Sequence, residues 1–228
     1  MKDVNYIVAF YNGTRRHYGR ETHWRTFLHA HIDFITNNMI DIGKVTFLIS
    51  WSNDNNDFKD DKEMIWYIES LDLPFNYETY TRVNNGFSYG AFAEVIEYNH
   101  KDYKYSFIIE DDYIPTSPDF MGYFLRKLEG SVVYVPSLYK DSHASICNGM
   151  INNKLLIDNI RLLGDYHGKD YRRGGYTNQR KFMTGYGKLG YTFDDITDVA
   201  HTEYLNSSKK IIKYGNKNGP LLIKPICV

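Results

Sequence analysis

Three consecutive acidic residues, Glu110, Asp111 and Asp112, directly follow a short apolar run at residues 107–109. Such a run is typical of a buried strand, and three like charges at its end lose hydration and repel one another unless a cation or a donor-rich ligand compensates them. Carboxylate oxygens bind Mg²⁺ and Mn²⁺ well, commonly together with a substrate phosphate. The alternative is an acidic turn that caps the next segment.

The segments before these acids alternate between the hydrophobic periodicity of strands and that of helices. Strands are predicted at residues 6–10, 45–50, 76–83 and 105–109, and the helices between them at residues 23–39, 60–71 and 89–99. This order predicts an α/β fold with a mostly parallel central sheet and helices on both of its faces. Ligands bind such sheets at the carboxyl ends of the strands, which is where the three acids are expected.

The pattern is less regular after the acids. Pro115 and Pro118 interrupt the chain, and residues 164–176 are polar and contain several glycines, as in a loop. Further helices are predicted at residues 119–128, 154–163 and 182–189, a strand at 132–135, an extended segment at 145–150 and a Lys-rich tail from Lys209. A chain of 228 residues suits a single domain.

The composition excludes several classes of partner. The 27 Lys and Arg residues nearly balance 28 Asp and Glu residues, so no overall field favours nucleic acid or an anionic membrane. No segment has the roughly 20 apolar residues of a membrane span, and residues 1–16 do not resemble a signal peptide. Cys147 and Cys227 are expected to be free thiols in a reducing compartment such as the cytoplasm. Abundant Asn, Lys, Ile and Tyr are typical of an AT-rich genome, for example a viral or phage genome, in which case the compartment is the host cytoplasm.

Two segments together resemble the core of nucleotide-sugar-dependent glycosyltransferases with the GT-A fold, which is Rossmann-like. They are residues 84–91, NNGFSYGA, and residues 107–112, FIIEDD. In that family an Asn-x-Gly segment opens a helix and precedes an apolar strand that ends in a DxD-type motif, of which EDD is here the variant. The resemblance covers the element order of residues 4–136. It implies one domain over residues 1–228, with a nucleotide-sugar-binding part at 1–112 and a smaller acceptor-side part with the C-terminal tail at 113–228.

The resemblance implies a metal-dependent transferase that moves a sugar from a nucleoside diphosphate sugar, with a UDP-sugar favoured, to a glycan or protein-linked acceptor. Mn²⁺ or Mg²⁺ would neutralise the charge that develops on the diphosphate leaving group. Asp112 would be the direct metal ligand. Glu110 would orient metal-bound water or the donor sugar, Asp111 would approach the ribose hydroxyls or the metal, and His201 would be a further metal ligand, although a lone histidine can also be structural.

The nucleoside is expected across the ends of the first three strands. The residues that the resemblance places against it follow a strand or open a helix, and they are Phe10, Tyr11, Asn12, Asp54 or Asp57, Asn85 and Tyr89. The alternative for Tyr11 and Tyr89 is ordinary packing. The alternative for Asp54 and Asp57 is a solvated turn.

The catalytic base is less well defined by the resemblance. If Gly190-Tyr191 matches the Gly-Tyr that closes a late helix in inverting family members, their Glu-Asp pair falls at Asn178-Gln179, and neither residue can act as a base. Either another carboxylate serves, or the enzyme retains configuration and needs no such base. The available carboxylates are Asp165, Asp170, Asp194 and Asp195. Arg172 and Arg173, flanked by glycines, suit a lid that closes over the diphosphate, or else a solvated loop.

The sequence disfavours one related class of enzyme and leaves a non-catalytic alternative open. A sugar nucleotidyltransferase is disfavoured because residues 12–14, Asn-Gly-Thr, do not form the glycine-rich, Arg-bearing sequence that binds a triphosphate after the first strand. A P-loop enzyme is disfavoured because no P-loop motif is present. A non-catalytic carbohydrate- or partner-binding module on the same fold remains an alternative. His29 and His31 lie two residues apart on a predicted helix, so they do not share a face and are not expected to chelate a metal. The sequence leaves the acceptor and the oligomeric state open.

Overall fold

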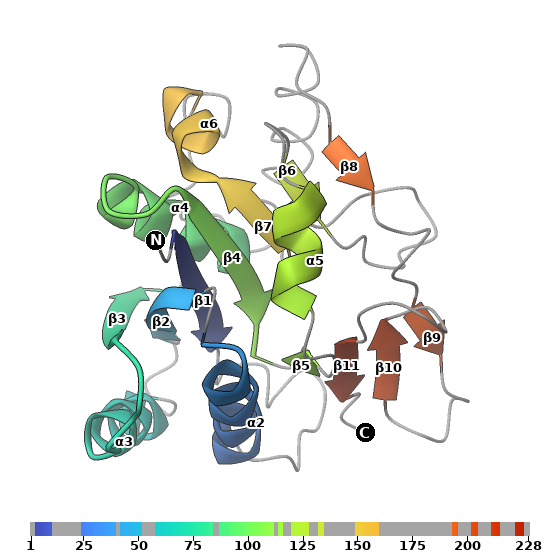
Figure 1. The fold of residues 1–228 in the computed structure, drawn as a ribbon. Coiled ribbons are helices and arrows are strands. Elements are labelled where there is room, and N and C mark those ends of the chain that lie inside the picture. Colours follow the sequence, from blue (N-terminus) through green and yellow to red (C-terminus); the bar gives the residue numbers. More distant parts are fainter. Residues whose placement is uncertain are drawn as a thin grey trace.

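The structure, a computed structural model, describes residues 3–10, 24–39, 42–51, 58–83, 87–111, 114–115, 120–127, 132–134, 149–159, 193–195, 202–204, 211–214 and 222–225. Its centre is a seven-stranded sheet in the order β3-β2-β1-β4-β7-β6-β8 (Figure 1). These strands are β1 (Val4–Phe10), β2 (Ile42–Trp51), β3 (Tyr77–Val83), β4 (Tyr105–Glu110), β6 (Val132–Tyr134), β7 (Gly149–Asn152) and β8 (Phe193–Asp195).

The central sheet is mostly parallel, as the sequence predicts. Strand β1 pairs in parallel with β2 and with β4, β2 pairs in parallel with β3, and β6 pairs in parallel with β8. Strand β7 runs against both of its neighbours, β4 and β6. All seven residues of β1 are buried, which fits an inner strand of a parallel sheet covered on both faces.

Helices cover both faces of this sheet (Figure 1). Helices α2 (Trp24–Asn37), α3 (Phe58–Glu69) and α5 (Phe120–Lys127) contribute to one apolar core, and α4 (Phe87–Asn99) and α6 (Asn153–Asp158) contribute to the other. Side chains of β1 alternate between the two, because successive residues of a strand point to opposite faces. Tyr6, Val8 and Phe10 enter the first core, whereas Ile7 and Ala9 enter the second.

A second, smaller sheet contains four strands that periodicity did not predict, and β8 of the central sheet was not predicted either. The smaller sheet is antiparallel, in the order β5-β11-β10-β9. Its strands are β5 (Ile114–Pro115), β9 (Thr202–Tyr204), β10 (Ile211–Tyr214) and β11 (Leu222–Pro225). The expected Lys-rich tail therefore contains two strands. Pro115 lies on the edge strand β5, where a missing backbone donor is tolerated, and Ile114 pairs with Ile223 just beyond the acids.

The predicted elements of the N-terminal half agree with the structure to within a few residues. Later, the helix expected at 154–163 is present as Asn153–Asp158, and the extended segment expected at 145–150 overlaps β7. The loop at 164–176, the helix at 182–189 and both cysteines lie outside the described residues. Among the helices that the structure describes, none is both long and apolar enough to cross a bilayer.

Candidate functional site

The candidate site lies at the carboxyl end of β4, next to the end of β1. The ladder between these strands ends at the pair Ala9 and Glu110. Glu110 is half-buried, and Asp111, one residue further on, is 7% exposed. From β1 the chain proceeds to β2 on one side of the sheet, whereas β4 lies on the other side, so the strand order reverses here. Open α/β sheets bind ligands at such a switch point.

Two hydrogen bonds hold the main chain of Asp111 on either side of its Cα atom. Its N–H donates to the carbonyl oxygen of Ala9 at 3.0 Å, which extends the contact with β1. Its carbonyl oxygen lies 3.0 Å from Nε2 of His31, a fully buried residue of α2. Asp111 is therefore attached to both β1 and α2.

The tautomer of His31 follows from its two partners. A carbonyl oxygen can only accept, so Nε2 carries the proton that is donated to Asp111. The other nitrogen, Nδ1, lies 3.0 Å from the hydroxyl of Tyr6, which then donates to it. Burial raises the pKa of Tyr6 well above its ordinary value, so the phenol keeps the proton that this bond requires. Tyr6, His31 and Asp111 form a continuous chain of donors and acceptors.

Aromatic packing restricts the same group of residues. The ring of Tyr6 stacks on Phe107 of β4 with centroids 5.3 Å apart and an interplanar angle of 23°. Phe10 meets the His31 ring edge-on at 6.4 Å. Rings held in this way have little freedom to reorient. The sequence carries one signal for a role of His31: this polar residue interrupts the apolar stripe of α2, at the core spacing of Phe27, Leu28 and Ile35.

The described carboxylates suit a hard divalent cation, although they do not complete its site. Glu110 and Asp111 place two carboxyl groups at the strand end, and Mg²⁺ is commonly bound through one or two carboxylates together with substrate phosphates. Within the described part of the chain, no group of three His, Cys, Asp or Glu residues could hold a metal ion. His29 is exposed and His31 is buried, so the two histidines lie on different faces of α2.

The other residues of the expected site fall into two groups. Phe10 is fully buried in the core, Tyr89 lies in the first turn of α4, and Asp194 and Asp195 belong to β8 at the edge of the sheet. The rest are outside the residues that the structure describes, and their roles stay predictions. They are Tyr11, Asn12, Asp54, Asp57, Asn85, Asp112, Asp165, Asp170, Arg172, Arg173 and His201.

A buried ion pair that the sequence did not reveal lies near the carboxyl end of β3. Nε of Arg82 donates to a carboxylate oxygen of Glu94 on α4 at 2.9 Å, and the hydroxyl of Tyr80 donates to the other oxygen at 3.0 Å. Arg82 is 6% exposed. Burial, followed by the hydrogen bond and the charge of Glu94, raises the pKa of Tyr80 to about 12. These contacts attach α4 to β3 near the edge where the acids lie.

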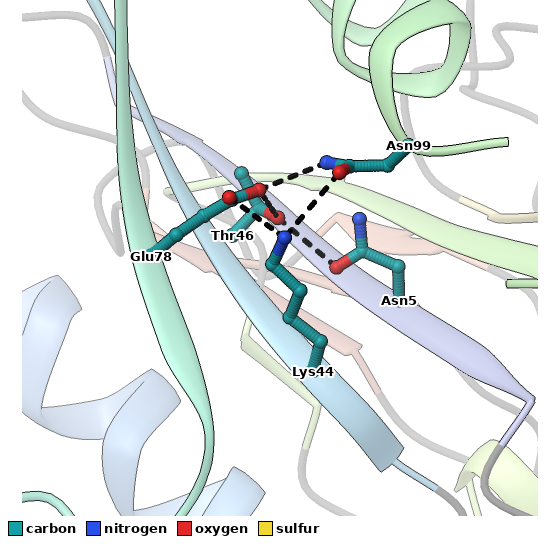
Figure 2. A network of polar contacts seen from close by, with 5 residues as sticks. All are labelled: Asn5, Lys44, Thr46, Glu78 and Asn99. Atoms are coloured by element: carbon teal, nitrogen blue, oxygen red, sulfur yellow. Dashed lines mark hydrogen bonds and ion pairs between the residues drawn. The ribbon is translucent and has the colours of Figure 1, made fainter. Parts of the chain in front are cut away.

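A second polar network lies at the opposite, amino-terminal end of the strands (Figure 2). Nζ of Lys44 lies 2.7 Å from Oε2 of Glu78 and donates to Oδ1 of Asn99 at 3.3 Å. The amide of Asn99 donates to Oε1 of Glu78 at 2.8 Å. The Thr46 hydroxyl is 3.0 Å from both Glu78 Oε1 and Asn5 Oδ1, so its single proton can serve either acceptor. These groups largely satisfy one another, which favours a structural role.

Comparison with known proteins identifies the fold. No family model matches the sequence, and no curated protein matches it significantly. Among solved structures, 4-diphosphocytidyl-2C-methyl-D-erythritol synthase from Anaerococcus prevotii is similar, with 14% identity, a TM-score of 0.55, and coverage of 85% of this chain and 86% of that one. A protein from Desulfovibrio desulfuricans described as a nucleotide-diphospho-sugar transferase has 9% identity and a TM-score of 0.53, covering 86% and 80%.

The glycosyltransferase GlyE from Streptococcus pneumoniae is also similar, with 12% identity and a TM-score of 0.51. The match covers 85% of this chain but 45% of GlyE, so this chain corresponds to less than half of that protein. Identities this low establish the fold alone. The chain therefore has a Rossmann-like α/β fold similar to that of these transferases, as predicted from its sequence, and a fold alone does not determine a function.

Proposed function

We propose that the chain is a metal-dependent glycosyltransferase that moves a sugar from a UDP-sugar to a glycan or protein-linked acceptor. One observation carries the proposal: Glu110 and Asp111 lie at the carboxyl end of β4, beside the end of β1, where the strand order of the parallel sheet reverses. That edge is where an open α/β sheet binds its ligand. Carboxylate oxygens there are of the kind that bind a divalent cation together with a substrate diphosphate.

The proposed division of roles follows the position of each acid along the chain. Asp112 binds the metal directly, Glu110 orients metal-bound water or the donor sugar, Asp111 approaches the ribose or the metal, and His201 completes the ligands. Bound Mn²⁺ or Mg²⁺ would act as a Lewis acid on the leaving diphosphate. Helix α4 begins at Phe87, directly after the Asn-Gly segment, so its first N–H groups face the carboxyl edge and can bind phosphate oxygens.

The first test measures ligand binding by thermal unfolding. MnCl₂ together with UDP is expected to raise the melting temperature, because a ligand that binds only the folded state stabilises it by about 2.7 kcal/mol at a concentration of 100 times its Kd. Asp112→Asn should remove this shift. Asp102→Asn is the matched control, because Asp102 is an exposed acid before the amino end of β4 and its loss should leave the shift intact.

The second test identifies the reaction. UDP-, GDP- and dTDP-sugars are incubated with the protein and MnCl₂, and release of the nucleoside diphosphate is measured. Release that depends on Mn²⁺ and is lost in Asp112→Asn supports glycosyl transfer. Pyrophosphate release from a nucleoside triphosphate and a sugar 1-phosphate would instead show nucleotidyl transfer. If Mn²⁺ and UDP produce no thermal shift and no sugar nucleotide is consumed, the proposal is wrong and a non-catalytic binding module is favoured.

A further inference from the structure

We propose that His31 is a positioning residue that sets the orientation of the acidic turn at Glu110 and Asp111. The inference rests on the proposed function, because it concerns how well the turn binds a cation with a diphosphate. His31 does not touch the substrate in this proposal. It acts through the main-chain carbonyl of Asp111, and it is itself oriented by the hydroxyl of Tyr6.

The geometry places His31 where the strand ladder stops. The pairing of β1 with β4 ends at Ala9 and Glu110, and one further backbone bond reaches the N–H of Asp111. The next main-chain group along the chain, the Asp111 carbonyl, is bound by Nε2 of His31. The main chain of Asp111 is therefore held on both sides of its Cα atom, and each held peptide group is planar and rigid.

The choice of histidine at this position also favours a specific role. His31 is fully buried on the apolar stripe of α2, where a leucine or phenylalanine would pack without desolvating two ring nitrogens. The ring reaches from β1 to the turn beyond β4, and Phe10 and Tyr6 pack against it at 6.4 Å and 6.1 Å. The rigid ring of His31 accepts from Tyr6 on β1 and donates to Asp111, so it fixes the position of the turn relative to β1.

Loss of the hydrogen bond from His31 to the Asp111 carbonyl should weaken cation binding more than it destabilises the fold. Hydrogen bonds that orient metal-binding groups typically change metal affinity by 10–100-fold when removed. The effect of His31 passes through one peptide group. We therefore expect a roughly tenfold increase in the Kd for Mn²⁺ in the presence of UDP when the Nε2 donor is removed.

Two isosteric variants separate positioning from packing. In His31→Gln the side-chain amide nitrogen can occupy the place of Nε2 and donate to Asp111, whereas in His31→Asn the amide is too short and its polar atoms lie near the place of Nδ1. Tyr6→Phe leaves His31 in place but removes the hydroxyl that orients it. Ile35→Val is a control for general destabilisation, because Ile35 is buried in the same helix and belongs to the same core without taking part in the chain of hydrogen bonds.

The Kd for Mn²⁺ is measured by titration of each variant in saturating UDP, alongside its melting temperature. His31→Asn is expected to weaken Mn²⁺ binding about tenfold, His31→Gln to restore most of it, and Tyr6→Phe to give an intermediate loss. Ile35→Val should keep the wild-type Kd although its melting temperature falls. If the Kd follows the melting temperature across all four variants, or if His31→Asn binds Mn²⁺ as tightly as the wild type, the positioning role is refuted.

A nuclear magnetic resonance measurement without metal or nucleotide keeps the two proposals distinguishable. The ring nitrogen shifts of His31 should report a proton on Nε2 and none on Nδ1, since the Asp111 carbonyl accepts from Nε2. A proton on Nδ1 would overturn the contact itself. If the tautomer is as expected but the wild-type protein binds neither Mn²⁺ nor UDP, the proposed function fails and the positioning role fails with it. Normal wild-type binding that is unchanged in His31→Asn removes the positioning role alone.

Discussion

His31 and Asp111 are 80 positions apart in the sequence, yet Nε2 of His31 lies 3.0 Å from the main-chain oxygen of Asp111. This contact joins α2 to the turn that follows β4. Tyr6 supports it from β1, with its hydroxyl 3.0 Å from Nδ1. Fold and candidate site therefore share one buried chain of hydrogen bonds, and substitutions along it should affect both.

Tyr6→Phe is expected to lower the free energy of unfolding by about 1–3 kcal/mol, because it removes the hydroxyl that donates to the buried His31 ring. The aromatic ring stays, so its stacking on Phe107 at 5.3 Å is preserved. Urea denaturation monitored by fluorescence measures the change. Tyr67→Phe is the matched control, because the Tyr67 hydroxyl meets His29 at 2.9 Å in an exposed place, and its loss should cost within about 0.5 kcal/mol. Equal losses in the two variants would contradict the importance of the buried bond.

Glu78→Gln is expected to destabilise the fold by about 1–3 kcal/mol, because the side chain of Lys44, only 14% exposed, loses its counter-charge at 2.7 Å. The glutamine oxygen can still accept from Asn99, so the loss of stability measures mainly the effect of the missing negative charge. A double-mutant cycle with Lys44→Met should show coupling between the two substitutions of about 1–2 kcal/mol.

The exposed pair Lys154 and Asp158 provides the comparison for that cycle. Its side chains are 81% and 52% exposed, and the residues lie four apart on α6. Coupling between Lys154→Met and Asp158→Asn should be about 0.3–0.5 kcal/mol. Similar coupling energies for the exposed and the partly buried pairs would show that burial of Lys44 adds nothing.

The alkaline pH dependence of stability should depend on Tyr80. Its pKa is raised from 10.0 to about 12, chiefly by burial and then by Glu94. The unfolded chain therefore releases this proton first as the pH rises. The stabilisation is fully present below pH 10 and is lost progressively as the pH approaches 12. Unfolding measured across that range should show a shallower decline in Tyr80→Phe than in the wild type.

The same tyrosine allows the role of Glu94 to be measured directly. Glu94→Gln should lower the pKa of Tyr80, because the carboxylate that accepts its proton at 3.0 Å loses its charge. Tyr98→Phe is the control, because Tyr98 makes the smallest contribution to the shift and removal of its hydroxyl should leave the pKa of Tyr80 near 12. The titration of the Tyr80 hydroxyl can be followed by nuclear magnetic resonance through the chemical shift of the ring carbon that carries it. An unchanged pKa in Glu94→Gln would exclude the charge of Glu94 as a cause.

Hydrophobic periodicity predicted the N-terminal half of the fold because its elements are long, and the spacing of apolar residues within each element shows which side chains are buried. Strand β1 is a run of buried residues, and α2 repeats its apolar positions at helical spacing. The position of Glu110 and Asp111 followed from the same pattern, since the acids come directly after the buried run of β4.

The rest depends on contacts between distant residues. Strand β8 has three residues and β5 has two, too few for a period of two to stand out. The pairing of Tyr6 with His31, or of Arg82 with Glu94, is determined by how helices pack on the sheet, and neither pair forms a sequence motif. His31 was identifiable only as a polar residue at a core position, without any indication of its partners.

The pairing of Ile114 with Ile223 has a consequence for biosynthesis. The four parallel strands β3, β2, β1 and β4 all lie within the first half of the chain, so they can associate while later residues are still being added. Strand β5 must wait until residues 222–225 have left the ribosome, because its partner β11 comes last among the strands. Pairings of such long sequence separation form slowly. A nascent chain can therefore assemble these four parallel strands first, and Ile114 and Pro115 are anchored only after residues 222–225 have been synthesised.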